Sequence, residues 1–293
     1  MTILRSPLFV PGNKASMLEK ALGLDPDAFV PDMEDSVPAA EKANARETVR
    51  SFLPKLAATG RLVIPRVNAL ETHWFDADVA AVVGPHVFGI SIGKIRTAAD
   101  ISTISQRLAA AEDRAGLPTG QLRLLPWIET AEAIVNLNAI CRASERIVAV
   151  AFGGEDFTND MGIERLADES QIAYARQALC ITARAAHVLA LDTPYFKLRD
   201  PDGLRLNCTH AKSIGFKGKF AIHPEQLEAL NECFSPSPAE IAHAERVVAA
   251  FEEAERRGRG STSLDGWVID VPVVKRARAL LDLARRIRED RDR

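Results

Sequence analysis

Two carboxylates stand at the ends of segments whose apolar pattern predicts consecutive parallel strands. Glu129 ends the segment 125–129, Leu-Pro-Trp-Ile-Glu, and Asp156 ends the segment 148–156, Val-Ala-Val-Ala-Phe-Gly-Gly-Glu-Asp. Neighbouring strands lie about 4.8 Å apart, so acidic groups at the same end of two adjacent strands can bind one divalent cation. Two carboxylate ligands suit Mg²⁺, which keeps several water positions that a chelating oxyacid substrate can take over. The sequence therefore predicts a magnesium site at Glu129 and Asp156.

The elements that must position these residues alternate between short apolar strands and amphipathic helices. Helical patterns such as 39–56, 98–115 and 171–187 separate strands expected at 8–10, 28–30, 62–64, 88–90, 124–126, 147–150, 188–191 and 220–222. Such alternation predicts an α/β protein with a parallel sheet, and this number of units matches a (β/α)8 TIM barrel. An open doubly wound sheet is the alternative. The barrel is favoured because the first strand lacks a following GxGxxG sequence and no P-loop signature occurs.

Polar residues of both charges follow the predicted strands. Catalytic groups of a barrel lie at the carboxyl ends of its strands, so these residues are expected on one rim. Arg66 and Lys94 are suited to bind a carboxylate or to stabilise an enolate oxygen, a combination that carbon–carbon bond cleavage beside a thioester requires. The alternative is that the charged residues only form ion pairs at loop ends. The full set is Asn13, Lys14, Asp32, Glu34, Asp35, Arg66, Asn68, Lys94, Glu129, Glu155, Asp156, Asp192 and His223.

The chain continues after the eighth predicted strand. Residues 1–234 are expected to form the barrel domain and residues 235–293 a C-terminal helical tail. The tail begins with a helical pattern at 236–257, followed by a Gly-rich hinge at 258–263 and a short extended segment at 267–272 before a final helix. We expect this appendage to be too small for a core of its own, so that it packs on the barrel or on a neighbouring subunit.

Composition disfavours several classes of function. A net charge of −3 and a pI near 6.1 provide no field that would attract nucleic acid or a membrane surface. No apolar run approaches the roughly 20 residues that span a bilayer, and residues 1–5 lead directly into a strand rather than a signal sequence. The four cysteines lack CxxC spacing, so disulfides and structural zinc are not expected. These features predict a cytoplasmic protein with small-molecule substrates.

Six ordered motifs extend over nearly the whole chain. They are Arg5–Gly12 (RSPLFVPG), Asp32–Val37 (DMEDSV), Pro65–Asn68 (PRVN), Ile128–Thr130 (IET), Phe152–Phe157 (FGGEDF) and Lys219–Pro224 (KFAIHP). Together they resemble the HpcH/HpaI aldolase and citrate lyase β-subunit family. Within it, the chain looks most like the CitE-like proteins and the malyl-CoA and citramalyl-CoA lyases.

The resemblance implies roles for particular residues. Glu129 and Asp156 match the glutamate and aspartate that bind Mg²⁺ in the family, which agrees with the prediction from the strand ends. Arg66 matches an arginine that contacts substrate, and we assign both Arg66 and Glu129 to the substrate site. The family uses its first βα region for coenzyme A, which the substrate carries. This places Phe9, Lys14 and Lys20 near the nucleotide.

The tail also matches the family in one respect. In malyl-CoA and citramalyl-CoA lyases, a C-terminal segment closes over the active site of a neighbouring subunit and contributes an aspartate that acts as acid or base. Residues 267–272, Trp-Val-Ile-Asp-Val-Pro, resemble that segment, with Asp270 as the aspartate. The alternative is that Asp270 only caps the last helix, since an Asp shortly before a Pro is typical of a helix start.

The expected protein is a Mg²⁺-dependent carbon–carbon lyase, or the same enzyme working as a synthase, with Arg66 and Asp270 as catalytic residues. It would act on a malyl-CoA-like β-hydroxyacyl-CoA, which it cleaves to, or makes from, an acyl-CoA and a small 2-oxoacid. The resemblance predicts a homo-oligomer, a homotrimer or hexamer. Two alternatives are a citrate lyase β-subunit that acts on an acyl-carrier-protein thioester, and a barrel subunit without catalytic activity.

Two local features depart from the family pattern or point elsewhere. Gly93 stands where relatives usually carry a proline before Lys94, and we expect it to loosen the rim. Residues 89–93, Gly-Ile-Ser-Ile-Gly, match the GxSxG nucleophile elbow of α/β-hydrolases. Ser91 is expected inside a barrel strand, however, so a serine hydrolase is disfavoured.

Overall fold

The computed structural model describes residues 2–166 and 168–291. Its contacts divide the chain into two compact units, Met1–Leu230 and Asn231–Arg293. The domain boundary that the sequence suggests, between residues 234 and 235, stays a prediction.

The first unit is a barrel of parallel strands. Its strands are β1 (Pro7–Pro11), β2 (Ala28–Asp32), β3 (Leu62–Val63), β4 (Arg66–Val67), β5 (Gly89–Ile95), β6 (Arg123–Ile128), β7 (Ala149–Phe152), β8 (Leu189–Asp192) and β9 (Gly218–Lys219). They are hydrogen-bonded in chain order, with β3 and β4 both paired to β2 at the third position of the barrel. The barrel closes where Phe9 N–H donates to the Ala221 carbonyl at 2.9 Å and Ala221 N–H donates to the Pro7 carbonyl at 2.8 Å. The predicted (β/α)8 architecture is confirmed.

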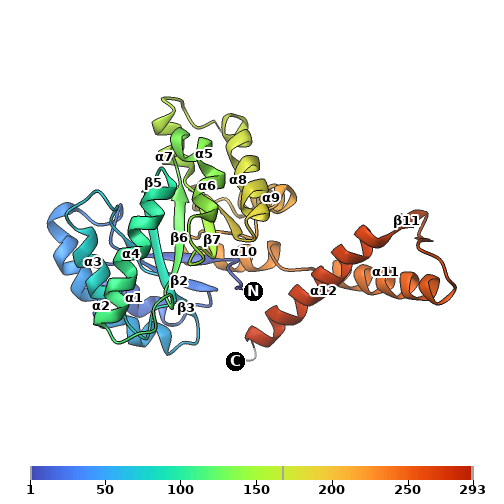
Figure 1. The fold of residues 1–293 in the computed structure, drawn as a ribbon, viewed down its shortest axis with the longest axis horizontal. Helices are drawn as coiled ribbons and strands as arrows, with labels where there is room; N and C mark the ends of the chain where they lie inside the picture. Colours follow the sequence, from blue (N-terminus) through green and yellow to red (C-terminus); the bar gives the residue numbers. More distant parts are fainter. Residues whose placement is uncertain (1, 167, 292–293) are drawn as a thin grey trace. The chain divides into compact units, whose positions relative to one another are not determined.

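Helices follow the strands and surround them. Figure 1 shows α1 to α4 on one side of the strands and α5 to α9 on the other. Several helices begin at a capping side chain, as at Thr97, whose hydroxyl forms a capping box with Asp100 at the start of α4. The helical segments are α1 (Ala15–Ala21), η1 (Ala39–Glu41), α2 (Lys42–Ala57), α3 (Phe75–Val82), α4 (Ala98–Arg114), α5 (Ala131–Val135), α6 (Leu137–Arg142), α7 (Gly154–Asp160), η2 (Ser170–Ile172), α8 (Ala173–Ala185), α9 (Pro201–Ile214), η3 (Pro224–Gln226) and α10 (Leu227–Cys233).

Apolar side chains from alternate strand positions fill the barrel. Phe9, Trp127 and Phe220 stack against one another with ring centroids 4.5 to 5.7 Å apart. The Trp127 indole N–H donates to Ser91 Oγ at 2.8 Å, so both polar groups are satisfied inside the strands. Ser91 is completely buried in β5, as expected, and therefore cannot serve as a hydrolase nucleophile in this fold.

Two strand boundaries differ from those the apolar pattern indicates. β5 continues past Ile90 to Ile95, with a bulge between Ile92 and Ile95. The last barrel strand is Gly218–Lys219, whereas the sequence places it at 220–222. The apolar pattern does not identify Lys219 as a strand residue because Lys219 is charged. The charge can be buried in the strand because Nζ lies 2.6 Å from Asp192 Oδ2 and 2.6 Å from the Thr193 carbonyl.

The second unit has a small core, which corrects the expectation that the tail lacks one. It contains the helices α11 (Pro238–Arg256) and α12 (Val271–Arg291) and the hairpin of β10 (Thr262–Leu264) and β11 (Trp267–Ile269). The buried residues packed together there are Ala244, Val247, Phe251, Ile269, Val274 and Ala277. The hairpin turns at Asp265 and Gly266, which both have positive φ, 51° and 82°. Thr262 and Ser263 thus belong to a strand, although the sequence suggests that the hinge extends over them.

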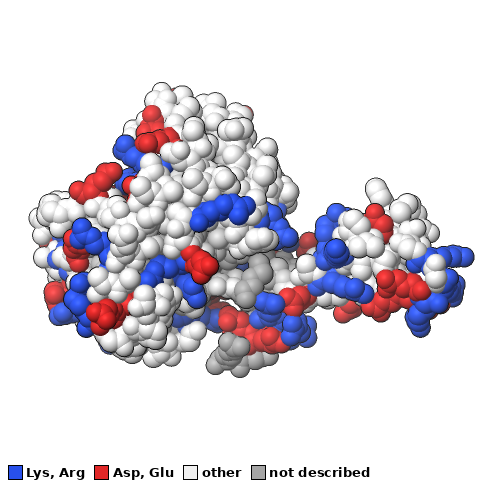
Figure 2. All heavy atoms as spheres, in the orientation of Figure 1, with Lys and Arg blue, Asp and Glu red and all other residues white. Residues whose placement is uncertain are grey.

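Surface charge is mixed in sign. Figure 2 shows Lys and Arg side chains interspersed with Asp and Glu side chains over the drawn face of the barrel unit. Among the described residues, no helix has the length and apolar character needed to cross a bilayer. The cytoplasmic location stays a prediction from the sequence.

The seam of the barrel leads to a test of stability. A Cβ atom at Gly218 would overlap the carbonyl oxygen of Leu4, which lies across the seam. We expect Gly218→Ala to lower the free energy of unfolding by about 2–4 kcal/mol, because backbone atoms rather than flexible side chains would have to move. Urea unfolding followed by circular dichroism measures the change. Gly84→Ala is the matched control, since its Cβ would have no neighbour closer than 4.0 Å. Equal stability of the two variants would contradict this account of the seam.

Candidate active site

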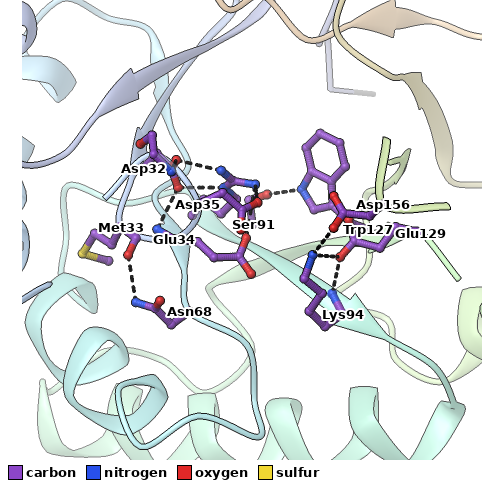
Figure 3. A network of polar contacts seen from close by, with 12 residues as sticks. Asp32, Met33, Glu34, Asp35, Asn68, Ser91, Lys94, Trp127, Glu129 and Asp156 are labelled. Carbon is purple, nitrogen blue, oxygen red and sulfur yellow. Dashed lines mark hydrogen bonds and ion pairs between the residues drawn. The ribbon is translucent and has the colours of Figure 1, made fainter. Parts of the chain in front are cut away.

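The candidate site lies at the carboxyl ends of the barrel strands, where five neighbouring elements contribute charged side chains (Figure 3). Asp32 ends β2, Arg66 begins β4, Lys94 lies in β5, Glu129 follows β6, and Asp156 lies in the first turn of α7. Asp32 and Arg66 are register partners in the sheet, so their side chains extend from adjacent strands at the same level. The structure therefore brings together the residues that the sequence singled out at these strand ends.

Arg66 is held by an acidic cluster on the β2 side of the site. Its Nε and Nη2 atoms each donate to a different oxygen of Asp32 at 2.7 Å, and Nη1 donates to Asp35 at 3.0 Å. The guanidinium carbon lies 4.6 Å from the centroid of the Phe9 ring. Burial acts to raise the pKa of Asp32, but the Arg66 charge outweighs it and lowers that pKa. Burial acts to lower the pKa of Arg66, yet Asp32 raises it overall, so the guanidinium stays charged.

Glu34 is the side chain of this cluster that is least satisfied. It is only 6% exposed, and its Oε2 lies 3.1 Å from Arg66 Nη1. That contact has the distance of an ion pair without the geometry of a hydrogen bond, and within the described chain Oε2 has no hydrogen-bond partner. Burial raises the pKa of Glu34 to about 8, against the opposing effect of Arg66. The carboxyl group is therefore largely protonated at neutral pH.

Lys94 occupies the other side of the site, between the two carboxylates predicted to bind metal. Its Nζ lies 2.6 Å from Asp156 Oδ1 and 3.5 Å from Glu129 Oε1 (Figure 3). Its backbone N–H also donates to Glu129 Oε1 at 2.5 Å. This is possible because Lys94 adopts a left-handed conformation, with φ of 59°, at the β5 bulge. Strained backbone of this kind is concentrated at functional sites.

Two glycines provide the space that the carboxylates need. A Cβ at Gly93 would come within 2.9 Å of Glu129 Oε1 and within 3.1 Å of Glu34 Oε1. A Cβ at Gly153 would come within 2.6 Å of Glu129 Oε2. Gly93 therefore does more than loosen the rim, which was its interpretation from the sequence. It allows two buried carboxyl groups to approach the same point of β5.

The charges around Glu129 bear on its capacity to hold a cation. Burial raises the pKa of Glu129, although Lys94 acts in the opposite direction. Burial acts to lower the pKa of Lys94, but Glu129 and Asp156 raise it overall. Glu129 and Asp156 thus already share one cation, the Lys94 ammonium. Among the described residues, no group of three or more His, Cys, Asp or Glu side chains is arranged to hold a metal.

The residues predicted to contact coenzyme A occupy two different places. Lys14 and Lys20 are exposed, at the start and in the last turn of α1. Phe9 instead points into the barrel, where it stacks on Phe220 at 5.0 Å and contacts the Arg66 guanidinium. The structure does not place Phe9 beside the two lysines on the surface of α1.

Asp270 belongs to the second unit and precedes α12. Its Oδ1 accepts a hydrogen bond from Val273 N–H at 3.2 Å, and its carbonyl accepts one from Val274 N–H at 3.0 Å. This is the helix cap that the sequence offered as the alternative reading. Capping does not preclude a second role, because the other carboxylate oxygen is not used in this bond. The role of Asp270 as an acid or base stays a prediction.

Other charged residues at the predicted strand ends have structural roles. Asp192 is completely buried and bonded to both Lys219 and Arg176. Glu155 pairs with Arg165 at 2.6 Å. His223 caps η3, where its Nδ1 accepts from Glu225 N–H at 3.3 Å. The sequence identified Glu34 as a rim residue but gave it no role, since its environment depends on contacts that no local pattern contains.

A closed parallel barrel with charged groups at the carboxyl ends of its strands is the arrangement of (β/α)8 enzymes. Residues 5–224 match the HpcH/HpaI aldolase/citrate lyase family. A citrate lyase subunit beta from Leuconostoc mesenteroides subsp. cremoris is 35% identical over 280 residues, which cover 96% of this chain and 93% of that protein. A (3S)-malyl-CoA thioesterase from Cereibacter sphaeroides is 38% identical over 284 residues, covering 97% of this chain and 95% of that protein. The chain belongs to the HpcH/HpaI aldolase/citrate lyase family, as the motifs predicted.

A solved structure is similar over the same extent. CitE from Mycobacterium tuberculosis, in complex with magnesium, acetoacetate and coenzyme A, superimposes with a TM-score of 0.79 at 26% identity. The match covers 96% of this chain and 98% of that chain. The similarity therefore includes the C-terminal part of the chain as well as the barrel.

The environment of Glu34 predicts a dependence of stability on pH. Because its pKa in the fold, about 8, exceeds the ordinary value of 4.5, the folded protein keeps a proton that the unfolded chain loses between these values. Stability is therefore expected to fall as pH rises through this range, by at most about 1.4 kcal/mol per pH unit from this group. In Glu34→Gln, which stays neutral, the decline should be shallower.

Urea unfolding of the metal-free protein in EDTA at several pH values between 5 and 8 measures this dependence. The comparison of parent and variant isolates Glu34 from Glu129, whose pKa is also raised. Parallel curves for the two proteins would show that Glu34 is ionised in the fold.

Proposed function

We propose that this protein is a Mg²⁺-dependent carbon–carbon lyase that cleaves or forms a malyl-CoA-like β-hydroxyacyl-CoA. The observation that carries the proposal is the arrangement of Glu129 and Asp156. Both carboxylates contact one cation, the Lys94 ammonium, at the rim of the barrel beside Arg66. Family membership supports it, as does the similarity to a CitE structure that contains magnesium, a small oxoacid and coenzyme A.

The residues present suit the metal. Carboxylate oxygens are the protein ligands that Mg²⁺ prefers, and one or two of them are typical. Glu129 and Asp156 would hold the ion, which would polarise the substrate oxygen at the bond to be broken. The Lys94 side chain is 32% exposed, so its ammonium has room to turn towards solvent when another cation takes its place.

Arg66 would hold the charged end of the substrate. Its guanidinium has five N–H donors, and two of them bind Asp32. The Asp32 pair fixes the plane of the guanidinium. Nη1 donates to Asp35, whose side chain is 55% exposed and has room to turn away, so an oxyacid carboxylate or an enolate oxygen would take its place at Nη1. Phe9, against the face of the same guanidinium, would bound this end of the site.

Asp270 would exchange a proton with the carbon of the acyl group. In the cleavage direction it would donate a proton to the enolate, and in the synthetic direction it would remove one. We propose that Asp270 reaches the barrel of a neighbouring copy, within a homotrimer or hexamer. Lys14 and Lys20, as exposed cations on one short helix, would contact the phosphates of coenzyme A.

A second candidate is hydrolysis of the thioester. The relative named (3S)-malyl-CoA thioesterase, at 38% identity, favours it. Ser91 is buried within β5, so hydrolysis would have to proceed by direct attack of water rather than through that serine. A third candidate is cleavage of a substrate that is bound as a thioester to an acyl-carrier protein. The relative named citrate lyase subunit beta favours it.

A panel of β-hydroxyacyl-CoA thioesters distinguishes these reactions by their products. A lyase releases a free 2-oxoacid and leaves the thioester intact in the acyl-CoA product. A thioesterase releases the free thiol of coenzyme A together with a hydroxyacid. Oxoacid release without free thiol supports the proposal, whereas free thiol without oxoacid establishes the thioesterase.

The predicted metal pair is tested by Asp156→Asn. We expect the variant to fold normally but to lose more than about 100-fold in kcat/KM, because one of only two carboxylate ligands loses its charge. Activity is measured across a Mg²⁺ titration. Glu155→Gln is the matched control, since this neighbouring side chain is paired with Arg165 instead of Lys94, and it should keep parent activity. An unchanged Mg²⁺ dependence in Asp156→Asn would remove this residue from the metal site.

Asp270→Asn tests the proton transfer. Asparagine caps helices as well as aspartate does, so α12 should be preserved while the proton is lost. We expect kcat to fall about 10²- to 10⁴-fold with little change in acyl-CoA binding. Mixed oligomers of Asp270→Asn and Asp156→Asn chains should regain activity if the tail acts on a neighbouring copy. Parent activity in Asp270→Asn would leave this residue with capping alone.

A further inference from the structure

A hollow in the barrel unit lies at the opposite end from the candidate active site. It has a volume of about 610 Å³, within the range of small-molecule sites, and lies beside the amino ends of β7 and β8 and the last turns of α8 and α9. We call it the amino-end groove. Its apolar lining includes Ile147, Val148, Ile181, Val188 and Ile214. Ile181 is 71% exposed, so part of this apolar lining faces solvent.

The charges in the amino-end groove have one sign. Arg184, His187 and Lys217 line it, and no Asp or Glu does so among the described residues. In the described part of the chain, none of these three side chains forms an ion pair. Burial lowers the pKa of Lys217, and the nearby cations Arg184 and Lys212 lower it further. Uncompensated cations at a concave apolar surface attract anions.

One of these residues stands where its backbone is strained. His187 follows the end of α8 with φ of 61°, the left-handed conformation that usually favours glycine at this position. The helix end is closed normally, because Val188 N–H donates to the Ala183 carbonyl at 3.0 Å. Glycine would therefore adopt this backbone conformation with less strain than histidine does. A binding role of the side chain would explain why histidine occupies the position.

We propose that the amino-end groove binds an amphiphilic anion, with its carboxylate or phosphate group against Arg184, His187 and Lys217 and a short alkyl chain over the isoleucines and valines. The alternative role of Arg184 is to complement the dipole at the end of α8, in whose last turn it lies. That role needs no ligand, and it extends to His187 and Lys217, which lie just after the C-terminal ends of α8 and α9. It does not account for the concave apolar lining beside these cations.

Isothermal titration calorimetry of the full-length protein with sodium octanoate tests the proposal. Octanamide has the same chain without the charge, and inorganic phosphate has the charge without the chain. We expect octanoate to bind more tightly than either probe, and its affinity to fall with added salt. Hexyl phosphate, compared with octanoate, identifies which headgroup is preferred.

Variants locate the binding. Arg184→Ala combined with Lys217→Ala should weaken octanoate about tenfold, because two partly exposed charges are lost. His187→Gly should also weaken it while leaving the protein at least as stable, since the strain is relieved. Lys212→Ala is the matched control, because it removes a nearby cation that does not line the groove, and we expect parent affinity.

Arg66→Lys separates this site from the candidate active site, where a carboxylate is also expected to bind. Lysine keeps a cation beside the buried Asp32 but lacks the planar fork that binds a carboxylate, so octanoate affinity should be unchanged in this variant, whatever becomes of its catalytic activity. Loss of binding in an Arg66→Lys protein that has the circular dichroism spectrum of the parent would assign the anion to the barrel's other end and overturn the proposal. Equal binding of octanamide, parent affinity in the double variant, or no binding of octanoate or hexyl phosphate at millimolar concentration would also overturn it.

Discussion

Acidic side chains are concentrated at the end of strand β2, and the Arg66 guanidinium is the cation that permits the burial of Asp32. Asp32 is only 1% exposed, and an unpaired carboxylate at such a position would cost several kcal/mol. Besides binding Arg66, its two oxygens accept the backbone N–H groups of Glu34 and Ser36 at 2.9 and 3.1 Å. The pair therefore fixes both the arginine and the loop that presents Glu34. Lys42 also supports this loop, since its Nζ donates to the Met33 and Glu34 carbonyls at 2.8 and 2.7 Å.

On the other side of the rim, a lysine rather than an arginine compensates the carboxylates. A bulge in β5 places both the backbone N–H and the ammonium of Lys94 against the carboxylates that follow the next two strands. Glu34 lies between these two arrangements, close to Gly93, and is neutralised by a proton rather than by a cation. The three buried acids at this rim, Asp32, Glu129 and Glu34, are thus stabilised in three ways, which are an arginine fork, a lysine and protonation.

The sequence predicted the barrel well because each strand is a short apolar run between helices, a pattern that depends on local residues alone. It failed where tertiary contacts override that pattern. Lys219 lies in a strand because Asp192 compensates its charge. Strand β5 continues to Lys94 beside two carboxyl groups because Gly93, which has no side chain, leaves room for them. That Glu129, Asp156 and Arg66 meet at one rim was predictable from their positions at strand ends, whereas metal binding by the two carboxylates stays a prediction. The raised pKa of Glu34 was not predictable, since it results from burial and from the neighbouring carboxylates Asp35 and Glu129.

The seam between the first and last strands has a consequence for synthesis on the ribosome. Lys219 N–H donates to the Arg5 carbonyl at 3.0 Å, and Ala221 N–H donates to the Pro7 carbonyl, so the barrel joins the beginning of the unit to its end. During translation, β1 can pair with β2 early, but its other edge stays open until the last strand has emerged. An open edge is a template for wrong pairing with another nascent chain. A pause in translation before the last strand has left the ribosome would prolong that exposure, whereas a pause after it has emerged would allow the barrel to close before the helical unit is complete.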